Sequence, residues 1–272
     1  MLGRKRPLPA LALACVLALP TASAARERGA DGVFGRRTSS HFELYEDVDI
    51  DHWSGRDGTR AFETAVLDVL EDAYDRVGNI LDLRPRGRQR VVVYDPGDFD
   101  RRFARSFGFR AAGFFDGAIH VRGDVRVDAR VTRTLHHEYV HCALAASAPP
   151  GTLPAWVNEG LAEWFENLAV GKRRLSAGEV AFLGDAAQRG LLGPLGALAG
   201  PSFAHQDGAT AAVSYVHAYA ALDHLARRKG DRGLRDFVRT LLRTRDVEAA
   251  LRRVYSLDTA ALDAQLRAEL RV

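Results

Sequence analysis

The residues best suited to chemistry are His137, Glu138 and His141, in the segment His-Glu-Tyr-Val-His. Histidines four positions apart project from one face of a helix, one turn apart. Two imidazoles at that spacing can hold a tetrahedral zinc ion through their ring nitrogens. Glu138 follows the first histidine, so its carboxylate can reach a water bound to the ion and act as a general base. The segment therefore predicts two metal ligands and a base for hydrolysis.

A third ligand is expected because a catalytic zinc site usually has three protein ligands and one open position. Glu159 lies 18 residues after His141, on a second predicted helix beyond a turn containing proline and glycine. Two helices joined by a short loop can pack antiparallel and bring Glu159 to the open side of the histidines. Glu163 shares its face, and Glu163 or Asn158 could accept the second ring N–H of a ligand histidine. The alternative is a solvated helix face, on which the two like charges repel mildly.

The segment 154–163 gives these residues a family context. Its sequence is Pro-Ala-Trp-Val-Asn-Glu-Gly-Leu-Ala-Glu. With the His-Glu-x-x-His segment before it, it resembles the thermolysin-like gluzincin metallopeptidases, and most closely their bacterial peptidase MA-like branch. The resemblance covers about residues 39–270, and its diagnostic part is 136–166. It implies a zinc peptidase that acts on peptide or protein substrates, with His137, His141 and Glu159 as ligands and Glu138 as base.

Two comparisons refine this resemblance. Thermolysin has an aspartate where Glu163 stands, so the contacts around the ligand histidines are expected to differ here. The metzincin pattern is excluded, because Leu144 and Ser147 occupy the positions of its glycine and its third histidine.

The resemblance also implies an oxyanion donor and a surface for the substrate. In the peptidase MA-like branch a tyrosine opens a later helix, and Tyr215 matches it; a donor there would stabilise the charge that develops on the scissile carbonyl. The alternative for Tyr215 is a tyrosine at the edge of the core, and His217 and Tyr219 are weaker candidates. The strand 117–121 is expected to form an exposed sheet edge, to which a peptide can add as a further strand. The remaining histidines considered, His120, His136 and His224, are expected to be structural or at the surface.

The hydrophobic pattern predicts an α+β fold. A small α/β lobe with a mixed sheet is expected over about residues 39–146, and a helical lobe over about 147–272, with the zinc-binding helix pair in the middle. Strands are expected at 41–45 and 90–94 and in a hairpin around Asp116-Gly117. Helices are expected at 59–83, 131–146, 154–169, 179–190, 209–229, 231–244, 246–254 and 258–270.

The first residues of the chain have a different composition. Residues 1–24 combine a basic start, an apolar run over 8–19 and an Ala-Ser-Ala site ending at Ala24, the pattern of a secretory signal peptide. The apolar run is shorter than the roughly 20 residues that span a bilayer, so no transmembrane anchor is predicted. We therefore expect an exported protein, periplasmic or secreted, that is cleaved near Ala24. Residues 25–38 are expected to form a flexible leader, and 39–272 the catalytic domain.

The charge and cysteine content exclude other classes. Removal of the signal peptide takes away three of the 38 basic residues and none of the 35 acidic ones, which leaves the charges balanced. The composition therefore gives no support for a nucleic-acid partner. Only Cys142 remains in the mature chain, so no internal disulfide can form. We interpret Cys142 as a small buried helix residue.

Two alternatives remain open at this point. The fold could serve as a binding or scaffold module with a structural zinc, which would need a fourth protein ligand such as Cys142, His136 or His217. It could also be a zinc hydrolase of a non-protein bond, for instance in cell-wall material. The sequence leaves the cleavage preference, any activating partner and the oligomeric state undetermined.

Overall fold

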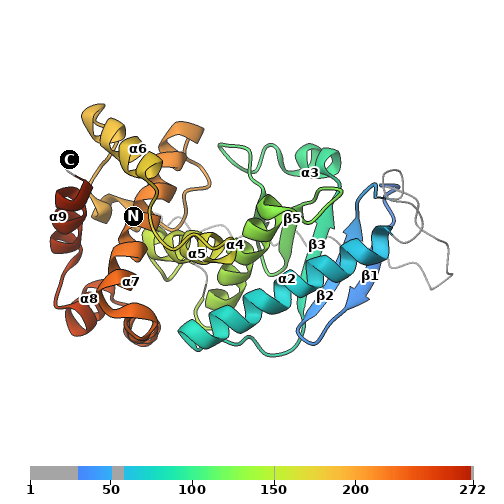
Figure 1. Cartoon of the computed structure of the whole chain (residues 1–272), viewed down its shortest axis with the longest axis horizontal. Helices are drawn as coiled ribbons and strands as arrows, with labels where there is room; N and C mark the ends of the chain where they lie inside the picture. The colour runs from blue at the N-terminus through green and yellow to red at the C-terminus, as the bar shows by residue number, and fades with distance from the viewer. Residues whose placement is uncertain (1–29, 51–57, 150, 271–272) are drawn as a thin grey trace, which may run out of the picture.

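The computed structural model describes residues 30–50, 58–149 and 151–270. The predicted signal peptide, residues 1–24, lies outside the described residues and stays a prediction. The described part has the expected α+β architecture, with a sheet toward the N-terminus and helices toward the C-terminus (Figure 1).

The N-terminal part is built on a mixed five-stranded sheet in the order β1-β2-β3-β5-β4. β2 and β3 pair in parallel, as do β3 and β5, whereas β1 and β4 pair antiparallel with their neighbours. Three consecutive valines make β3 a β-branched, buried strand near the middle of the sheet. The strands are β1 (Gly35–Thr38), β2 (Phe42–Asp47), β3 (Gln89–Tyr94), β4 (Gly113–Phe115) and β5 (Ile119–Arg122).

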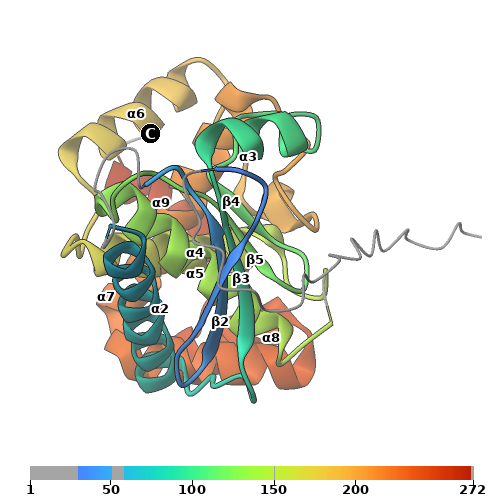
Figure 2. The same ribbon diagram turned by 90° about the vertical axis from the view of Figure 1, so that its right-hand side faces the viewer.

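Helices cover both faces of this sheet (Figures 1 and 2). The long helix α2 (Gly58–Leu81) and the helix α4 (Ala129–Ala145) share the main hydrophobic core with one face. The short helix α3 (Pro96–Phe103) packs Phe99 against Tyr45, Val92 and Tyr94 on the other face. The sequence predicts only a turn at the start of α3. The structure shows that the Asp95 side chain accepts from the Gly97 N–H and caps a helix there.

Two expectations about the sheet are corrected. Residues 35–38, assigned to the flexible leader, form β1, which pairs with β2 and is tied to it by the ion pair between Arg36 and Glu43. The strand expected at 117–121 as the exposed edge corresponds to β5, which lies inside the sheet between β3 and β4. The edge strand is β4. It forms a hairpin with β5 and pairs with one side of it, and β3 pairs with the other side.

The C-terminal part is helical. Its long helix α7 changes direction at Gly230, which has a positive φ of 61°, so the two expected helices at 209–229 and 231–244 form one interrupted element. The helices are α5 (Ala155–Ala169), α6 (Ala177–Gln188), the 3-10 turn η1 (Leu195–Ala199), α7 (Gly208–Thr244), α8 (Val247–Tyr255) and α9 (Thr259–Leu270). Within the described residues, no helix is both long and apolar enough to cross a membrane.

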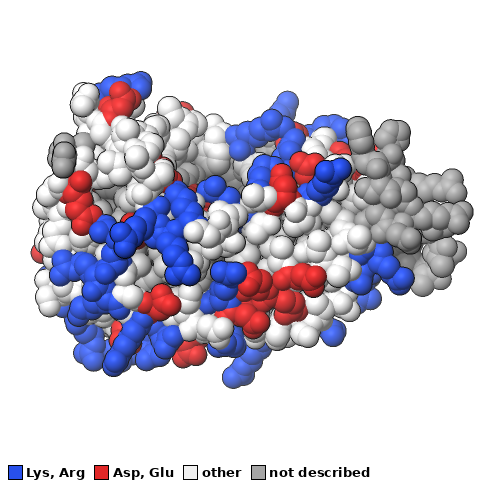
Figure 3. Space-filling model, in the orientation of Figure 1, with Lys and Arg blue, Asp and Glu red and all other residues white. Residues whose placement is uncertain are grey.

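Charged side chains are unevenly distributed on the face shown in Figure 3. Basic residues gather over α7 and α8, and acidic residues gather over α2 (Figure 3).

α5 packs between α4 and α7, and one glycine permits the close approach to α7. A Cβ built on Gly160 would lie 2.6 Å from the backbone oxygen of Ala218, a distance that side chains do not tolerate. Because Gly160 follows Glu159 directly, this packing also fixes the position of the candidate ligand.

We expect Gly160→Ala to destabilise the protein by about 1–3 kcal/mol, the usual cost of overpacking a core. Urea unfolding of both proteins measures the difference. The matched control is Gly178→Ala in α6, where the nearest atom to a new Cβ is 3.9 Å away. That control should unfold at equal or higher urea, because alanine favours a helix over glycine by about 1 kcal/mol. Equal stability of Gly160→Ala and the wild type would contradict the packing argument.

Candidate metal centre

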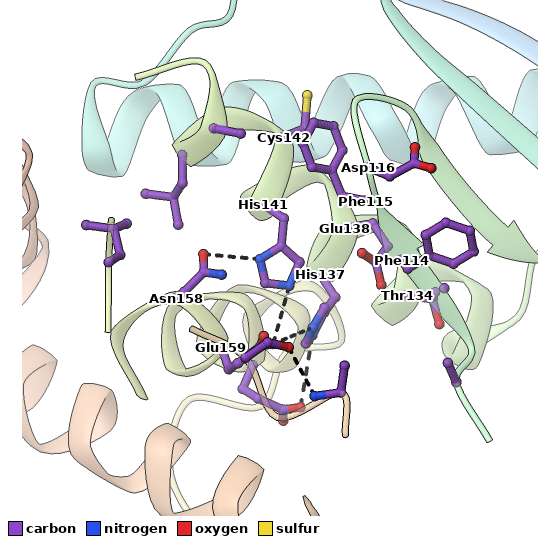
Figure 4. A pocket seen from close by; sticks show the side chains of 18 of the residues that line it. Phe114, Phe115, Asp116, Thr134, His137, Glu138, His141, Cys142, Asn158 and Glu159 are labelled. Carbon is purple, nitrogen blue, oxygen red and sulfur yellow. Dashed lines mark hydrogen bonds and ion pairs between the residues drawn. The ribbon is translucent and has the colours of Figure 1, made fainter. Parts of the chain in front are cut away.

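The site is formed by α4 and α5. Asp128 precedes α4, and its side chain accepts from the backbone N–H of Val131 and caps the helix. One turn apart on the same face, His137 and His141 direct their rings toward α5 (Figure 4). The next helix, α5, brings Glu159 to the two imidazoles (Figure 4).

A single carboxylate oxygen faces both histidines. Oε2 of Glu159 lies 3.5 Å from Nε2 of His137 and 3.4 Å from Nε2 of His141. Both separations are longer than a normal N–H···O hydrogen bond of about 2.7–3.2 Å. Ligand atoms at about 2.0–2.1 Å from one tetrahedral ion lie roughly 3.3–3.4 Å apart. Both nitrogen–oxygen separations therefore match the spacing of ligand atoms around one tetrahedral ion.

The opposite ring nitrogens explain which atoms face the centre. Nδ1 of His141 donates to Oδ1 of Asn158 at 3.2 Å, and Nδ1 of His137 donates to Oε2 of Glu166 at 3.0 Å. Because Nδ1 is engaged in these hydrogen bonds, Nε2 is the atom that each imidazole can offer to a metal ion. The Glu159 carboxylate faces both imidazoles, and this donor set of two ring nitrogens and one carboxylate oxygen fits zinc.

Asn158 thus makes the contact that the sequence predicts, whereas Glu163 does not. Glu163 Oε1 is 4.0 Å from Nδ1 of His137, beyond hydrogen-bond distance, and Glu166 takes that place. Glu166 is not among the residues that the sequence predicts for the site. A signal was available: seven residues after Glu159 is about two full turns, so Glu166 lies within roughly 20° of Glu159 around the helix and Glu163 about 40° away.

Glu138 is buried beside the centre. It is 5% exposed, and its Oε2 has no hydrogen-bond partner among the described residues. Burial raises the pKa of its carboxyl above the ordinary value. The edge strand lies close to it, since a Cβ on Gly113 would come within 2.9 Å of Glu138 Oε1. Only glycine at this point leaves room for the carboxylate between α4 and β4.

An open cleft of about 940 Å³ exposes these residues to the outside. Its walls include β4 and the following turn, where Phe114, Phe115 and Asp116 are found (Figure 4). Tyr215, near the start of α7, also lines the cleft, and its ring centroid is 6.2 Å from that of His137. It is half-buried, with its ring edge-to-face against Phe203. The structure therefore brings all seven residues predicted for the site to one cleft.

A comparison with protein families adds independent evidence. A sequence model described as the Peptidase MA superfamily matches residues 119–272, more than half of the chain. The chain belongs to the Peptidase MA superfamily. A search of curated proteins finds no match to it. As a member of this superfamily the protein is related to metallopeptidases, and the match begins at β5 and includes both α4 and α5.

Other polar residues of this Peptidase MA protein lie apart from the centre. His136 contacts Asp72 on α2 at 3.2 Å, and His217 faces Asp263 on α9 at 3.5 Å. Cys142 donates to Gln89, and its sulfur points away from the imidazoles (Figure 4). The rest are engaged elsewhere: His120 with Tyr94 and Asp116, His224 with Gln265 and Glu269, and Tyr219 under the ammonium of Lys172.

Proposed function

We propose that this Peptidase MA protein is a zinc-dependent peptidase. The observation that carries the proposal is the convergence of two imidazole Nε2 atoms on one carboxylate oxygen, at 3.5 and 3.4 Å, beside a buried carboxylate whose Oε2 has no hydrogen-bond partner among the described residues. In this proposal His137, His141 and Glu159 are the metal ligands and Glu138 is the general base.

When bound, zinc would act as a Lewis acid that polarises the scissile carbonyl and acidifies water. Glu138 takes a proton from the attacking water and returns it to the leaving amine. Its burial supports this role, because a carboxyl whose pKa is raised is a stronger base at neutral pH. Asn158 fixes the orientation of His141 through Nδ1.

The substrate is proposed to bind along β4. This strand is the edge of the sheet, and residues Gly113 to Gly117 line the cleft next to Glu138. An extended peptide could add to this edge through main-chain hydrogen bonds. The carbonyl to be cleaved would then lie between the edge strand and the histidines.

The structural-zinc alternative has less support. A closed site needs four protein ligands. In the described ranges, the groups able to hold a metal are His137 with His141 and Glu159, and His137 with Glu163 and Glu166. The three fourth ligands considered from the sequence, Cys142, His136 and His217, all contact other residues.

Metal analysis of the purified protein, paired with digestion of a peptide library, tests the proposal. We expect one zinc per chain, cleavage of peptides, loss of cleavage with a chelator and recovery on adding zinc. Zinc without peptide cleavage would reject the peptidase assignment, and cell-wall fragments digested in parallel would show whether another bond is the substrate. A protein that takes up no zinc would reject the centre itself.

Tyr215 is proposed to donate to the oxyanion. We expect Tyr215→Phe to keep its zinc and to lower kcat by up to about 10²–10³-fold, the range for loss of one oxyanion donor. Steady-state kinetics on a peptide found in the library measures the effect. Tyr219→Phe, a change at a buried tyrosine of the same helix that lies outside the cleft lining, is the control. Equal kcat values for the two variants would leave Tyr215 as a packing residue.

We also propose that the protein is exported with cleavage near Ala24. The support is the sequence pattern of residues 1–24. Intact-mass measurement of protein recovered from culture medium and periplasm of a bacterial host tests this. A full-length mass in the cytosolic fraction alone would reject export.

A further inference from the structure

One arginine on α4 is connected to the candidate metal centre through an intervening carboxylate. Arg133 lies one turn before His137, and its guanidinium binds Oε1 of Glu166 through Nε at 3.0 Å and Nη2 at 2.7 Å. The other oxygen of Glu166 accepts from Nδ1 of His137. Arginine, carboxylate and imidazole therefore form a continuous chain that joins α4 to α5.

This chain is itself held in place. Nη2 of Arg133 also donates to Oδ1 of Asn167, at 3.2 Å. Asn167 is buried, and its amide nitrogen donates to the backbone oxygen of Glu163. Lys172 adds a second donor to the same Asn167 oxygen. The guanidinium is thus fixed by the last turns of α5 and cannot rotate away without breaking several contacts.

We propose that Arg133 and Glu166 form a positioning pair that orients His137 and sets the zinc affinity of the centre. The inference rests on the proposed function, in which His137 is a zinc ligand. A carboxylate on Nδ1 fixes the tautomer of a ligand histidine and makes Nε2 more basic. Two N–H groups of Arg133 converge on Oε1 of Glu166 and hold this carboxylate charged and in place, because hydrogen bonds between a guanidinium and a carboxylate are charge-assisted.

The neighbouring carboxylate does not fill this role. Glu163 is also close to His137, but its nearest oxygen is 4.0 Å from Nδ1. No hydrogen bond from a described side chain restrains its carboxylate. The geometry therefore assigns the positioning role to Glu166, one turn further along α5.

Zinc affinity, measured by competition with a chromophoric chelator, tests the pair. Glu166→Gln should weaken zinc binding about 10–100-fold, the usual effect of losing such a partner. Arg133→Met should also weaken it, and Arg133→Lys should restore part of the loss, because lysine keeps the charge and loses the paired geometry. Glu163→Gln should have a smaller effect than Glu166→Gln.

The matched control is Arg130→Met. Arg130 lies on the same first turns of α4 but pairs with Asp124 at the surface, so its loss should leave zinc affinity unchanged. If Glu166→Gln fails to fold, the Arg133 variants decide the question, and thermal unfolding of each apoprotein separates misfolding from weaker binding. Wild-type affinity in both Glu166→Gln and Arg133→Met would overturn the inference.

The His137→Ala variant separates this failure from failure of the proposed function. If His137→Ala loses zinc while Glu166→Gln keeps it, the centre stands and the positioning pair is wrong. If His137→Ala binds zinc as the wild type does, the proposed centre itself is wrong.

Discussion

Glu138→Gln is expected to bind zinc normally and to lose at least about a hundredfold in kcat, the scale of general-base catalysis. The amide has the shape of the carboxylate but cannot take a proton. Glu138 is not one of the three residues whose ligand atoms converge, His137, His141 and Glu159, so its replacement removes no proposed ligand. Its Oε2 has no partner within the described chain, so the substitution breaks no hydrogen bond there.

Steady-state kinetics and zinc content of Glu138→Gln, measured on the same preparation, test this prediction. Thermal unfolding of the zinc-loaded variant serves as the control, and its midpoint should match or exceed that of the wild type. The midpoint can rise because burial of a carboxyl is costly and the neutral amide avoids that cost. Undiminished kcat in a folded, zinc-loaded variant would remove Glu138 from the mechanism.

Among the carboxylate substitutions, Glu159→Gln is expected to cause the largest loss of zinc affinity. The amide oxygen can occupy the same position, but the negative charge that faces both imidazoles is lost. Burial works to raise the pKa of Glu159, yet His141 and His137 together lower it below its ordinary value, so the wild-type group is ionised. We expect zinc affinity to fall by at least about a hundredfold, beyond the 10–100-fold range for outer partners.

Titration with zinc against a competing chelator measures this loss, and Glu163→Gln is the comparison. Both variants remove one charge from α5, but Glu163 lies 4.0 Å from Nδ1 of His137, whereas Glu159 faces Nε2 of both histidines. Glu159→Gln must therefore lose more affinity than Glu163→Gln. Equal losses would mean that the general negative charge of α5 attracts the metal and that Glu159 is not a ligand.

Helices were readily predicted because their patterns are local. The ends of the expected helices at 131–146 and 154–169 agree with those of α4 and α5 to within two residues. The histidine spacing in the first of these helices and the turn expected before the second were then enough to predict that His137, His141 and Glu159 lie together. Because α4 and α5 are antiparallel, residues late in α4 contact residues early in α5. His141 contacts Asn158, whereas the earlier residues His137 and Arg133 contact Glu166.

The failures of prediction share a different cause. β1 has the sequence Gly-Arg-Arg-Thr, which carries no apolar alternation, so its pairing with β2 decides its structure. The position of β5 inside the sheet follows from its pairing with β3, a contact between distant segments that no local pattern encodes. Glu166 was missed because Glu163, four residues after Glu159, already lay on the same face of the predicted helix. Which of the two carboxylates contacts His137 depends on how α5 is placed against α4, and the sequence of α5 alone does not give this placement.

The pairing of β1 has a practical consequence for preparing the protein. The backbone N–H groups of Asp31 and Gly32 donate to the Asp47 carboxylate, and β1 covers the outer side of β2. A recombinant chain that starts at residue 39 would leave the hydrogen-bonding groups of β2 open to other molecules, which favours aggregation. Expression should therefore start ahead of Asp31.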